Sequence, residues 1–399
     1  MRNLEDFFLA SRSLSSALLF LSLVASWFGA TSILVTADEA YQSGVSALWL
    51  VGVPAAATVL IFAVFLVGPI RRLDILTLPD LVERRYGKTV RHLASFLILW
   101  YMTVLAASQM VALGQFLQPF LGLPYVWSLV IGTGIVLVYL LSGGLLSVAA
   151  TDSLQCLLLT AGTVGLALFL AGKSSAAAVF EAAGEAGKRG YFNFFSGLEK
   201  NILIAFSFIL AWTISPIAWQ RIQAARSERA ARQGFFGAAG AFVGLYCLVV
   251  GVGVFALPLF SGRRLVAPLL SEIISSTLDN WGGALIFIAV VAAILSTMDT
   301  AINTGALTLT QDIYLQFVRG AKKSASAIRS SRGATLLVAF LALAVASRFQ
   351  SILKTLGLAS EIMAEGLFVP GLAMLVLKKR RPLAGGLSLL LGGGFALAS

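Results

Sequence analysis

The sequence predicts an all-α membrane protein, and its composition and one repeated pattern support this class. Among the 399 residues, 58% are hydrophobic and only 12% are charged, whereas about a quarter of the residues of a soluble domain are charged. The mean hydropathy is +0.91. Apolar stretches long enough to cross a bilayer as helices recur along the whole chain. A soluble globule with an ordinary polar surface is therefore excluded.

Eleven apolar stretches qualify as membrane spans, because about 20 apolar residues in a helix cover a hydrocarbon core of about 30 Å. They are residues 14–37, 46–70, 92–118, 125–142, 152–172, 201–220, 235–260, 281–308, 333–347, 352–377 and 383–399. The first could also be a signal peptide, but its apolar part is too long and its small residues make a poor cleavage site. We therefore expect a retained first helix and about 11 transmembrane helices.

The basic residues indicate how these spans are oriented. With the N-terminus inside, 21 of the 29 lysines and arginines fall on inner segments, Arg91 and Arg221 among them, as the positive-inside rule expects. Topology then explains the net charge of +11, and no nucleic-acid partner is required. We expect a multi-pass protein of the cell membrane (plasma or inner membrane) with a cytoplasmic N-terminus, in contact with the lipid bilayer. Its oligomeric state stays open.

Metal, redox and catalytic chemistry find little support in the sequence. One histidine and two cysteines cannot supply a zinc, haem or iron–sulfur ligand set, or a disulfide scaffold. No nucleophile and base occur at a recognisable spacing. We expect neither an enzyme nor a bound cofactor.

Two predicted spans carry an interruption at matching places. If spans one to five and six to ten are two halves, spans one and six correspond; Gly29 loosens the first and Pro216 interrupts the second. Transporters built from inverted repeats bind substrate and ions where such helices are broken near mid-membrane. Glycine and proline also occur in membrane helices for packing alone, so either break by itself is ambiguous.

Span eight carries a polar face along an otherwise apolar helix. At about 100° per residue, Ser296, Thr297 and Asp299 fall on the same side as Thr300 and Asn303. Oxygen ligands without an adjacent carboxylate suit a weakly held monovalent cation. Alternatively, the hydroxyls bond to carbonyls of their own helix or to a neighbouring helix. Asp299 favours a functional interpretation, because ionisable residues inside spans are functional by default.

Five further acidic residues lie at or near membrane depth. We expect Asp38 and Glu39 to cap the outer end of span one. Asp152 is expected to open span five, where the helix dipole stabilises a carboxylate. Glu361 and Glu365 share one face of span ten, where they could bind a cationic group, carry protons or face an outer vestibule.

Five groups of residues, in chain order, resemble motifs of the sodium/solute symporter family, which includes the proline, pantothenate and sodium/glucose symporters. They are residues 6–14 (DFFLASRSL), 77–80 with 84–87 (TLPD and RRYG), 143–155 (GGLLSVAATDSLQ), 219–225 (WQRIQAA), and 296–299 with 312–314 (STMD and DIY). Their order and spacing over most of the chain make the resemblance specific.

The resemblance implies a leucine-transporter-type fold, a 5+5 inverted-repeat helix bundle that works by alternating access. We expect a single transmembrane domain over residues 1–399, with the first repeat at 14–172 and the second at 201–377. An additional helix at 383–399 would be cut short if the chain is truncated there. The implied function is sodium-coupled secondary active transport that imports a small organic solute, with Na⁺ as the coupling ion.

The resemblance also implies a sodium site and its ligands. In the family, the shared site uses backbone carbonyls of the first core helix and hydroxyls of the eighth. The matching positions are the carbonyls of Ala25, Phe28 and Ala293 and the hydroxyls of Ser296 and Thr297. Sodium is the only metal ion that we expect this chain to bind.

The resemblance extends to coupling and substrate residues. Asp152 matches the family's aspartate near the inner end of the fifth core helix, which is associated with sodium coupling. We expect Asp152 and Asp299 to act in coupling. Candidates for substrate contact, at the broken middles of spans one and six, are Thr31, Ser32, Trp212 and Ser215.

Several departures and alternatives remain open. Trp27 stands where the proline-transporter branch has an acidic residue, which counts against proline as the substrate. Family members usually begin with one more helix and continue beyond span eleven, so a fragment, a misassigned start and a reduced member are all compatible with the sequence. The alternative functions are a transporter-like membrane sensor module and a proton-coupled symporter. Substrate identity is not fixed by the sequence.

Overall fold

The computed structural model describes residues 8–73, 75–263, 265, 267–317, 324–376 and 382–398. Within these ranges the regular structure is helical, apart from one isolated parallel bridge between Leu14 and Ala225. The predicted all-α class is confirmed. The first residues of the motif at 6–14, and the predicted boundaries at 1, 377 and 399, lie outside the described residues.

The first part of the chain contains the helices of predicted spans one to five, together with short helices before and after them. They are η1 (Ala10–Arg12), α2 (Ser16–Trp27), η2 (Thr31–Val35), α3 (Thr36–Ser43), η3 (Gly44–Trp49), α4 (Gly52–Ile61), η4 (Phe62–Leu66), α5 (Val67–Arg71), α6 (Leu78–Tyr86), α7 (Lys88–Leu121), α8 (Tyr125–Lys173) and α9 (Ala176–Glu185). Predicted spans four and five both lie within α8.

The second part of the chain contains the helices of predicted spans six to eleven. Its helices are α10 (Leu198–Thr213), α11 (Pro216–Ala224), α12 (Glu228–Phe260), α13 (Leu269–Ser276), α14 (Asn280–Leu307), η5 (Thr308–Tyr314), α15 (Leu315–Phe317), α16 (Ser324–Arg348), α17 (Ile352–Glu361), η6 (Ile362–Leu367), α18 (Phe368–Val376) and α19 (Pro382–Ala398). The segments η2, η4, η5 and η6 are π-helical turns, a feature that occurs frequently at functional sites.

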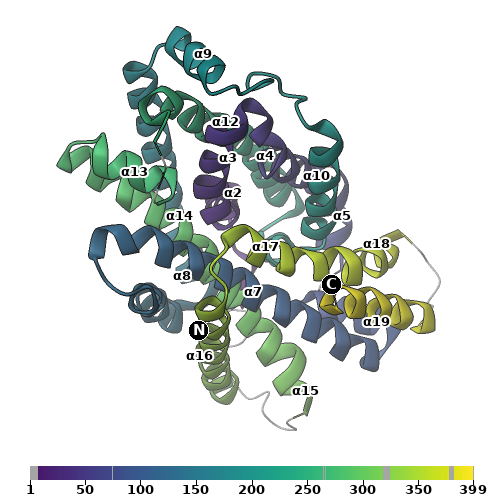
Figure 1. The fold of residues 1–399 in the computed structure, drawn as a ribbon. Coiled ribbons are helices and arrows are strands. Elements are labelled where there is room, and N and C mark those ends of the chain that lie inside the picture. Colours follow the sequence, from purple (N-terminus) through teal and green to yellow (C-terminus); the bar gives the residue numbers. More distant parts are fainter. Residues whose placement is uncertain are drawn as a thin grey trace.

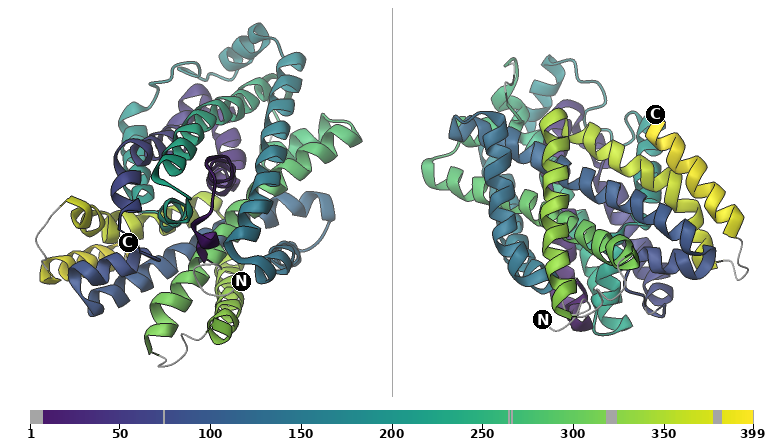
Figure 2. Two further views of the ribbon diagram at one scale, coloured as in Figure 1. Left: turned by 180° about the vertical axis from the view of Figure 1, so that it is seen from behind. Right: turned by 90° about the horizontal axis from the view of Figure 1, so that it is seen from below.

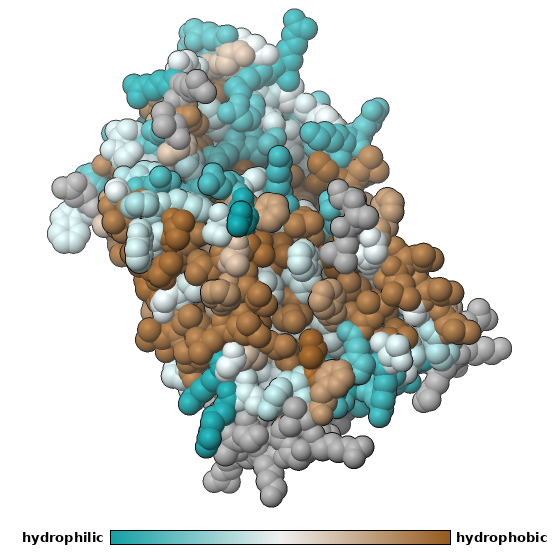
Figure 3. All heavy atoms as spheres, turned by 60° about the horizontal axis from the view of Figure 1, so that its bottom comes forward, coloured by the Kyte–Doolittle hydropathy of each residue, from teal (hydrophilic) through white to brown (hydrophobic). Residues whose placement is uncertain are grey.

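Among the described residues, eight helical stretches are long and apolar enough to cross a membrane, and a ninth is gained if α10 and α11 are one bent span. The shorter apolar helices Ser16–Trp27 and Pro382–Ala396 lie at the first and last predicted spans. A band of hydrophobic surface crosses the molecule between two hydrophilic ends (Figure 3). This belt is the surface that a bilayer requires of a protein that spans it.

The broken first helix lies in the interior of the bundle. Helix α12 packs against α2, α3 and α4, and α14 packs against α7, α8 and α2. Two opposite views place α2 and α3 in the middle of the molecule, while α9 and α13 lie at its periphery (Figures 1 and 2). The residues around the break in α2 are therefore enclosed by helices from both halves of the chain.

Candidate functional site

The first predicted break is present and lies between α2 and η2. Helix α2 ends at Trp27, and Phe28 leaves the helical conformation at φ −92° and ψ 62°. A Cβ on Gly29 would lie 2.4 Å from the Thr297 hydroxyl oxygen and 2.6 Å from the amide oxygen of Gln109. Only glycine lets the broken segment approach α14 and α7 this closely.

The second predicted break is also present. Helix α10 ends at Thr213, α11 begins at Pro216, and the two axes differ by 43°. Proline suits the first position of a helix, where its missing N–H costs nothing. The break thus leaves Ile214 and Ser215 as a short non-helical link inside the membrane-spanning region.

Four of the five predicted sodium ligands come together where α2 ends against α14. The Ser296 hydroxyl donates to the carbonyl of Ala25 at 2.8 Å and lies 3.0 Å from the carbonyl of Ala293. The Thr297 hydroxyl lies 3.5 Å from the same Ala293 carbonyl. Phe28, fully buried, follows directly after the last turn of α2. The contacts of both hydroxyls with the Ala293 carbonyl are bonds within α14, which the alternative interpretation of the polar face expects. The hydrogen bond from Ser296 to Ala25, in contrast, joins α14 to α2.

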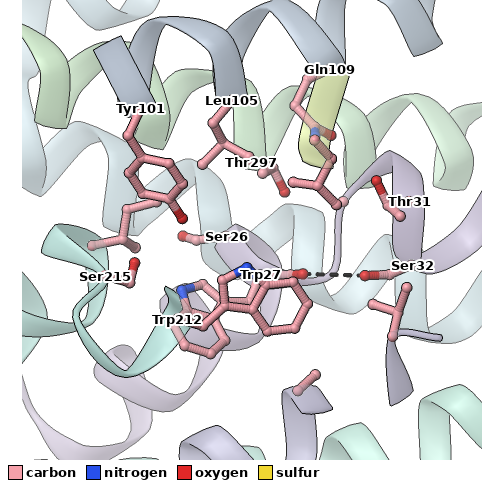
Figure 4. A pocket seen from close by; sticks show the side chains of 15 residues that line it. Ser26, Trp27, Thr31, Ser32, Tyr101, Leu105, Gln109, Trp212, Ser215 and Thr297 are labelled. Atoms are coloured by element: carbon pink, nitrogen blue, oxygen red, sulfur yellow. Dashed lines mark hydrogen bonds between the residues drawn. The ribbon is translucent and has the colours of Figure 1, made fainter. Parts of the chain in front are cut away.

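All four substrate candidates line one internal cavity (Figure 4). Thr31 and Ser32 follow the first break, while Trp212 and Ser215 flank the second. The cavity offers about 50 Å³ to the centres of water-sized molecules, which is room for a few waters. Thr297 borders the cavity as well, so the predicted sodium and substrate residues adjoin.

Two further lining residues, Tyr101 and Gln109 on α7, were missed by the sequence analysis. The amide oxygen of Gln109 accepts the backbone N–H of Ala30 at 2.9 Å, immediately after the first break. An amide side chain in an apolar span was the available signal. Its partner could not be foreseen, because the contact joins spans one and three across the fold.

Asp152 lies at the centre of a fully buried polar cluster. One carboxylate oxygen accepts hydrogen bonds from Ser22 at 2.6 Å and Ser26 at 3.1 Å, and lies 3.3 Å from a guanidinium nitrogen of Arg221. The same nitrogen contacts Ser26 and donates to Thr300 at 3.0 Å. The expectation that Asp152 opens a helix is wrong, because it lies well inside α8. The cluster joins α2, α8, α11 and α14.

Asp299 is buried beside this cluster. Its carboxylate accepts a hydrogen bond of 2.6 Å from the Tyr139 hydroxyl of α8, and it is near enough to Asp152 and Arg221 to interact electrostatically. One oxygen of Asp152 and one of Asp299 have no hydrogen-bond partner. The two predicted coupling residues therefore belong to one electrostatic group.

Two arginines that the sequence analysis assigned to inner segments are buried. Arg221 is completely inaccessible and pairs with Asp152, whose charge it neutralises. Arg91 is 5% exposed and pairs with Asp312 at 2.8 Å, with Asp80 at 2.9 Å and with Glu83. The ion pairs of this second cluster connect α6 and α7 to η5, which directly follows α14 at the end of the eighth span.

The acids beyond the first break do not simply cap a helix. Asp38 accepts the backbone N–H of Leu269, the first residue of α13, at 2.8 Å, and Glu39 accepts the hydroxyl of Ser43 at 2.5 Å. The predicted capping role is wrong for Asp38, since its partner is on another helix. Asp38 and Glu272 line a second, larger cavity of about 810 Å³ between α3, α7 and α13.

A comparison with protein families identifies the chain. A sequence model described as the sodium:solute symporter family matches residues 7–393. The chain belongs to the sodium:solute symporter family. This membership confirms the predicted resemblance.

Among curated relatives, the chain is 24% identical over 370 residues to a sodium/proline symporter of Haemophilus influenzae, covering 86% of this chain and 72% of that protein. It is 26% identical over 365 residues to a sodium/proline symporter of Staphylococcus aureus strain Newman, covering 86% and 70%. This member of the family is a sodium-coupled symporter and a multi-pass membrane protein.

A solved structure supports the fold. The substrate-bound outward-open state of a Na⁺-coupled sialic acid symporter superposes with a TM-score of 0.80 over 100% of this chain and 93% of that one, at 17% identity. The predicted leucine-transporter-type fold of this family member is confirmed.

Proposed function

We propose that this symporter imports a small organic solute across the cell membrane by alternating access, with its N-terminus cytoplasmic and one sodium ion as the coupling ion. The ion would bind between the end of α2 and the middle of α14. Its ligands would be the carbonyls of Ala25, Phe28 and Ala293 and the hydroxyls of Ser296 and Thr297.

One contact carries this assignment. The oxygens of Ser296 and Ala25 lie 2.8 Å apart although they belong to helices from the two halves of the chain. Neutral oxygens at the carbonyl end of a helix favour a cation, and without a carboxylate among them they hold it weakly enough for release. An ion at this point would fix the distance between α2 and α14.

The neighbouring cavity explains how ion and solute would be linked. Thr297 borders the cavity and contacts the carbonyl of Ala293, so an ion there would order the wall against which the solute binds. One charge moving across 100 mV releases about 2.3 kcal/mol, which supports roughly 50-fold accumulation per ion. The larger cavity beside Asp38 would serve as the vestibule through which the solute arrives.

Proton coupling is a second candidate, and the burial of Asp299 against Tyr139 favours it. A buried carboxylate with one unpartnered oxygen is a group that could take up a proton. Both candidates use the same fold, and they differ in which ion gradient drives uptake.

Uptake into proteoliposomes distinguishes the two. The purified chain is reconstituted and labelled solutes are offered with an inward sodium gradient at uniform pH, and then with an inward proton gradient in potassium buffer. We expect accumulation with the sodium gradient alone, abolished by a sodium ionophore. Accumulation driven only by the proton gradient would overturn the sodium assignment.

A further inference from the structure

The cavity between the two breaks is lined without any formal charge. Fifteen described residues border it, and all of them are neutral (Figure 4). Burying an ionised group without a partner costs several kcal/mol. Two charged residues, Asp152 and Arg221, contact the lining residue Ser26, and they pair with each other. A charged solute would therefore lose its hydration in this cavity without gaining a side-chain counter-ion.

A backbone group that could hold a carboxylate is already occupied. Exposed N–H groups at the start of a helix are a natural anion site, and Ala30 is where the chain resumes a helical path after the first break. Its N–H donates to Gln109 at 2.9 Å. Because an N–H can only donate, the atom that faces it must be the amide oxygen, so the amide of Gln109 is fixed and competes with any anion for this donor.

A cationic solute is disfavoured by the ion itself, a step that rests on the proposed function. Thr297 borders the cavity, and a sodium ion bound at its hydroxyl would bring a positive charge to the cavity wall. Like charges repel strongly where water is excluded, so this ion disfavours a cationic group. The same ion would attract an anionic group, so anions and zwitterions are disfavoured only by the uncharged lining and by the occupied N–H of Ala30.

One lining residue of the cavity has a hydroxyl without a partner. Thr31 borders the cavity, and its side-chain oxygen, buried in this conformation, forms no hydrogen bond. A buried hydroxyl without a partner is costly, and a solute can satisfy it as donor or acceptor. Figure 4 shows Thr31, Gln109 and Thr297 on one side of the cavity and the two tryptophans on another.

Trp27 and Trp212 form a rigid apolar wall opposite Thr31 (Figure 4). The ring centroids of Trp27 and Trp212 lie 6.1 Å apart. Trp27 stacks on Phe242 and Trp212 on Phe208, at 6.5 Å and 4.9 Å. Rings held in this way bury the apolar face of a ligand without losing side-chain freedom.

From these contacts we infer that the solute is uncharged and polyhydroxylated, with hydroxyl groups that meet Thr31 and an apolar face that packs on Trp27 and Trp212. The size of the cavity in this conformation requires its lining to open for a ring-sized solute. Zwitterions, cations and anions are rejected mainly by desolvation.

The test is sodium-driven uptake of labelled solutes by the full chain in proteoliposomes. The neutral probes are a pool of monosaccharides and cyclic polyols, including D-glucose and myo-inositol; the charged probes are L-proline, choline and lactate. We expect uptake of a neutral probe only. Uptake confined to charged probes, or the absence of uptake for every neutral probe, would overturn the substrate class.

A matched pair of variants locates the contact. Thr31→Val removes the cavity hydroxyl, and we expect about a tenfold higher half-saturation concentration for the neutral probe. Thr58→Val is the control, because Thr58 is also a fully buried, unpartnered hydroxyl but does not line the cavity. Equal effects of the two substitutions would overturn the assignment of Thr31. Neutral uptake that proceeds equally in potassium would instead refute sodium coupling and leave the substrate class standing.

Discussion

A guanidinium nitrogen of Arg221 lies 3.3 Å from a carboxylate oxygen of Asp152, and both side chains are completely buried. The pair connects α11, which follows the second break, with α8. Ser26, which lines the solute cavity, contacts both members. Movement of α11 relative to α8 would therefore separate a buried ion pair, and movement of α2 would break hydrogen bonds to it.

Removal of one partner of this pair should be more harmful than removal of both. Arg221→Gln leaves Asp152, beside Asp299, without its guanidinium partner, and an unpaired buried charge costs about 3–5 kcal/mol. Asp152→Asn should cost less, because Arg221 keeps the electrostatic attraction of Asp299. The double variant should recover most of the loss caused by Arg221→Gln. Chemical unfolding of the purified variants in detergent measures this, and additive losses in the double variant would show that the two side chains do not act as a pair.

Gly29→Ala should disable the site although it adds a single methyl group. The new Cβ would lie 2.4 Å from the Thr297 hydroxyl oxygen and 2.6 Å from the amide oxygen of Gln109. We expect a destabilisation of about 1–3 kcal/mol and loss of sodium-dependent uptake. Gly134→Ala on α8 is the matched control, since a Cβ there meets nothing within 4 Å. Wild-type uptake by Gly29→Ala would contradict the close approach of α2, α7 and α14.

Arg91→Lys should loosen the attachment of α6 and α7 to η5. The guanidinium of Arg91 contacts three carboxylates on α6 and η5, and a lysine ammonium lacks the planar fork that serves them together. We expect faster amide hydrogen exchange in α6 and at the end of α14. The exposed Arg229→Lys serves as the control. Unchanged exchange in α6 would show that these ion pairs do not hold α6 in place.

Local patterns predicted the spans and both breaks. Hydropathy located the helices because a bilayer demands long apolar stretches, and Gly29 and Pro216 marked the interruptions because their backbone chemistry acts at the residue itself. The spacing of Ser296 and Thr297 predicted a shared face, and the structure brings both to the Ala293 carbonyl.

Long-range partners could not be read in the same way. Gln109 and Ala30 are far apart in sequence, as are Arg221 and Asp152, and only the packing of the bundle joins them. A count of charges assigned Arg221 to an inner segment as a topological signal but could not reveal its burial. The ligand role of the predicted sodium residues stays a prediction.

The sodium response of the purified chain tests the central claim most directly. Thermal unfolding is followed in potassium buffer while sodium is added, because an ion that binds only the folded state stabilises it by about 2.7 kcal/mol at a hundred times its Kd. We predict such stabilisation for the wild type and for the control Thr335→Ala, whose hydroxyl bonds only within α16. Ser296→Ala combined with Thr297→Ala should require at least about tenfold more sodium. An unchanged sodium response in that double variant would contradict the assigned site.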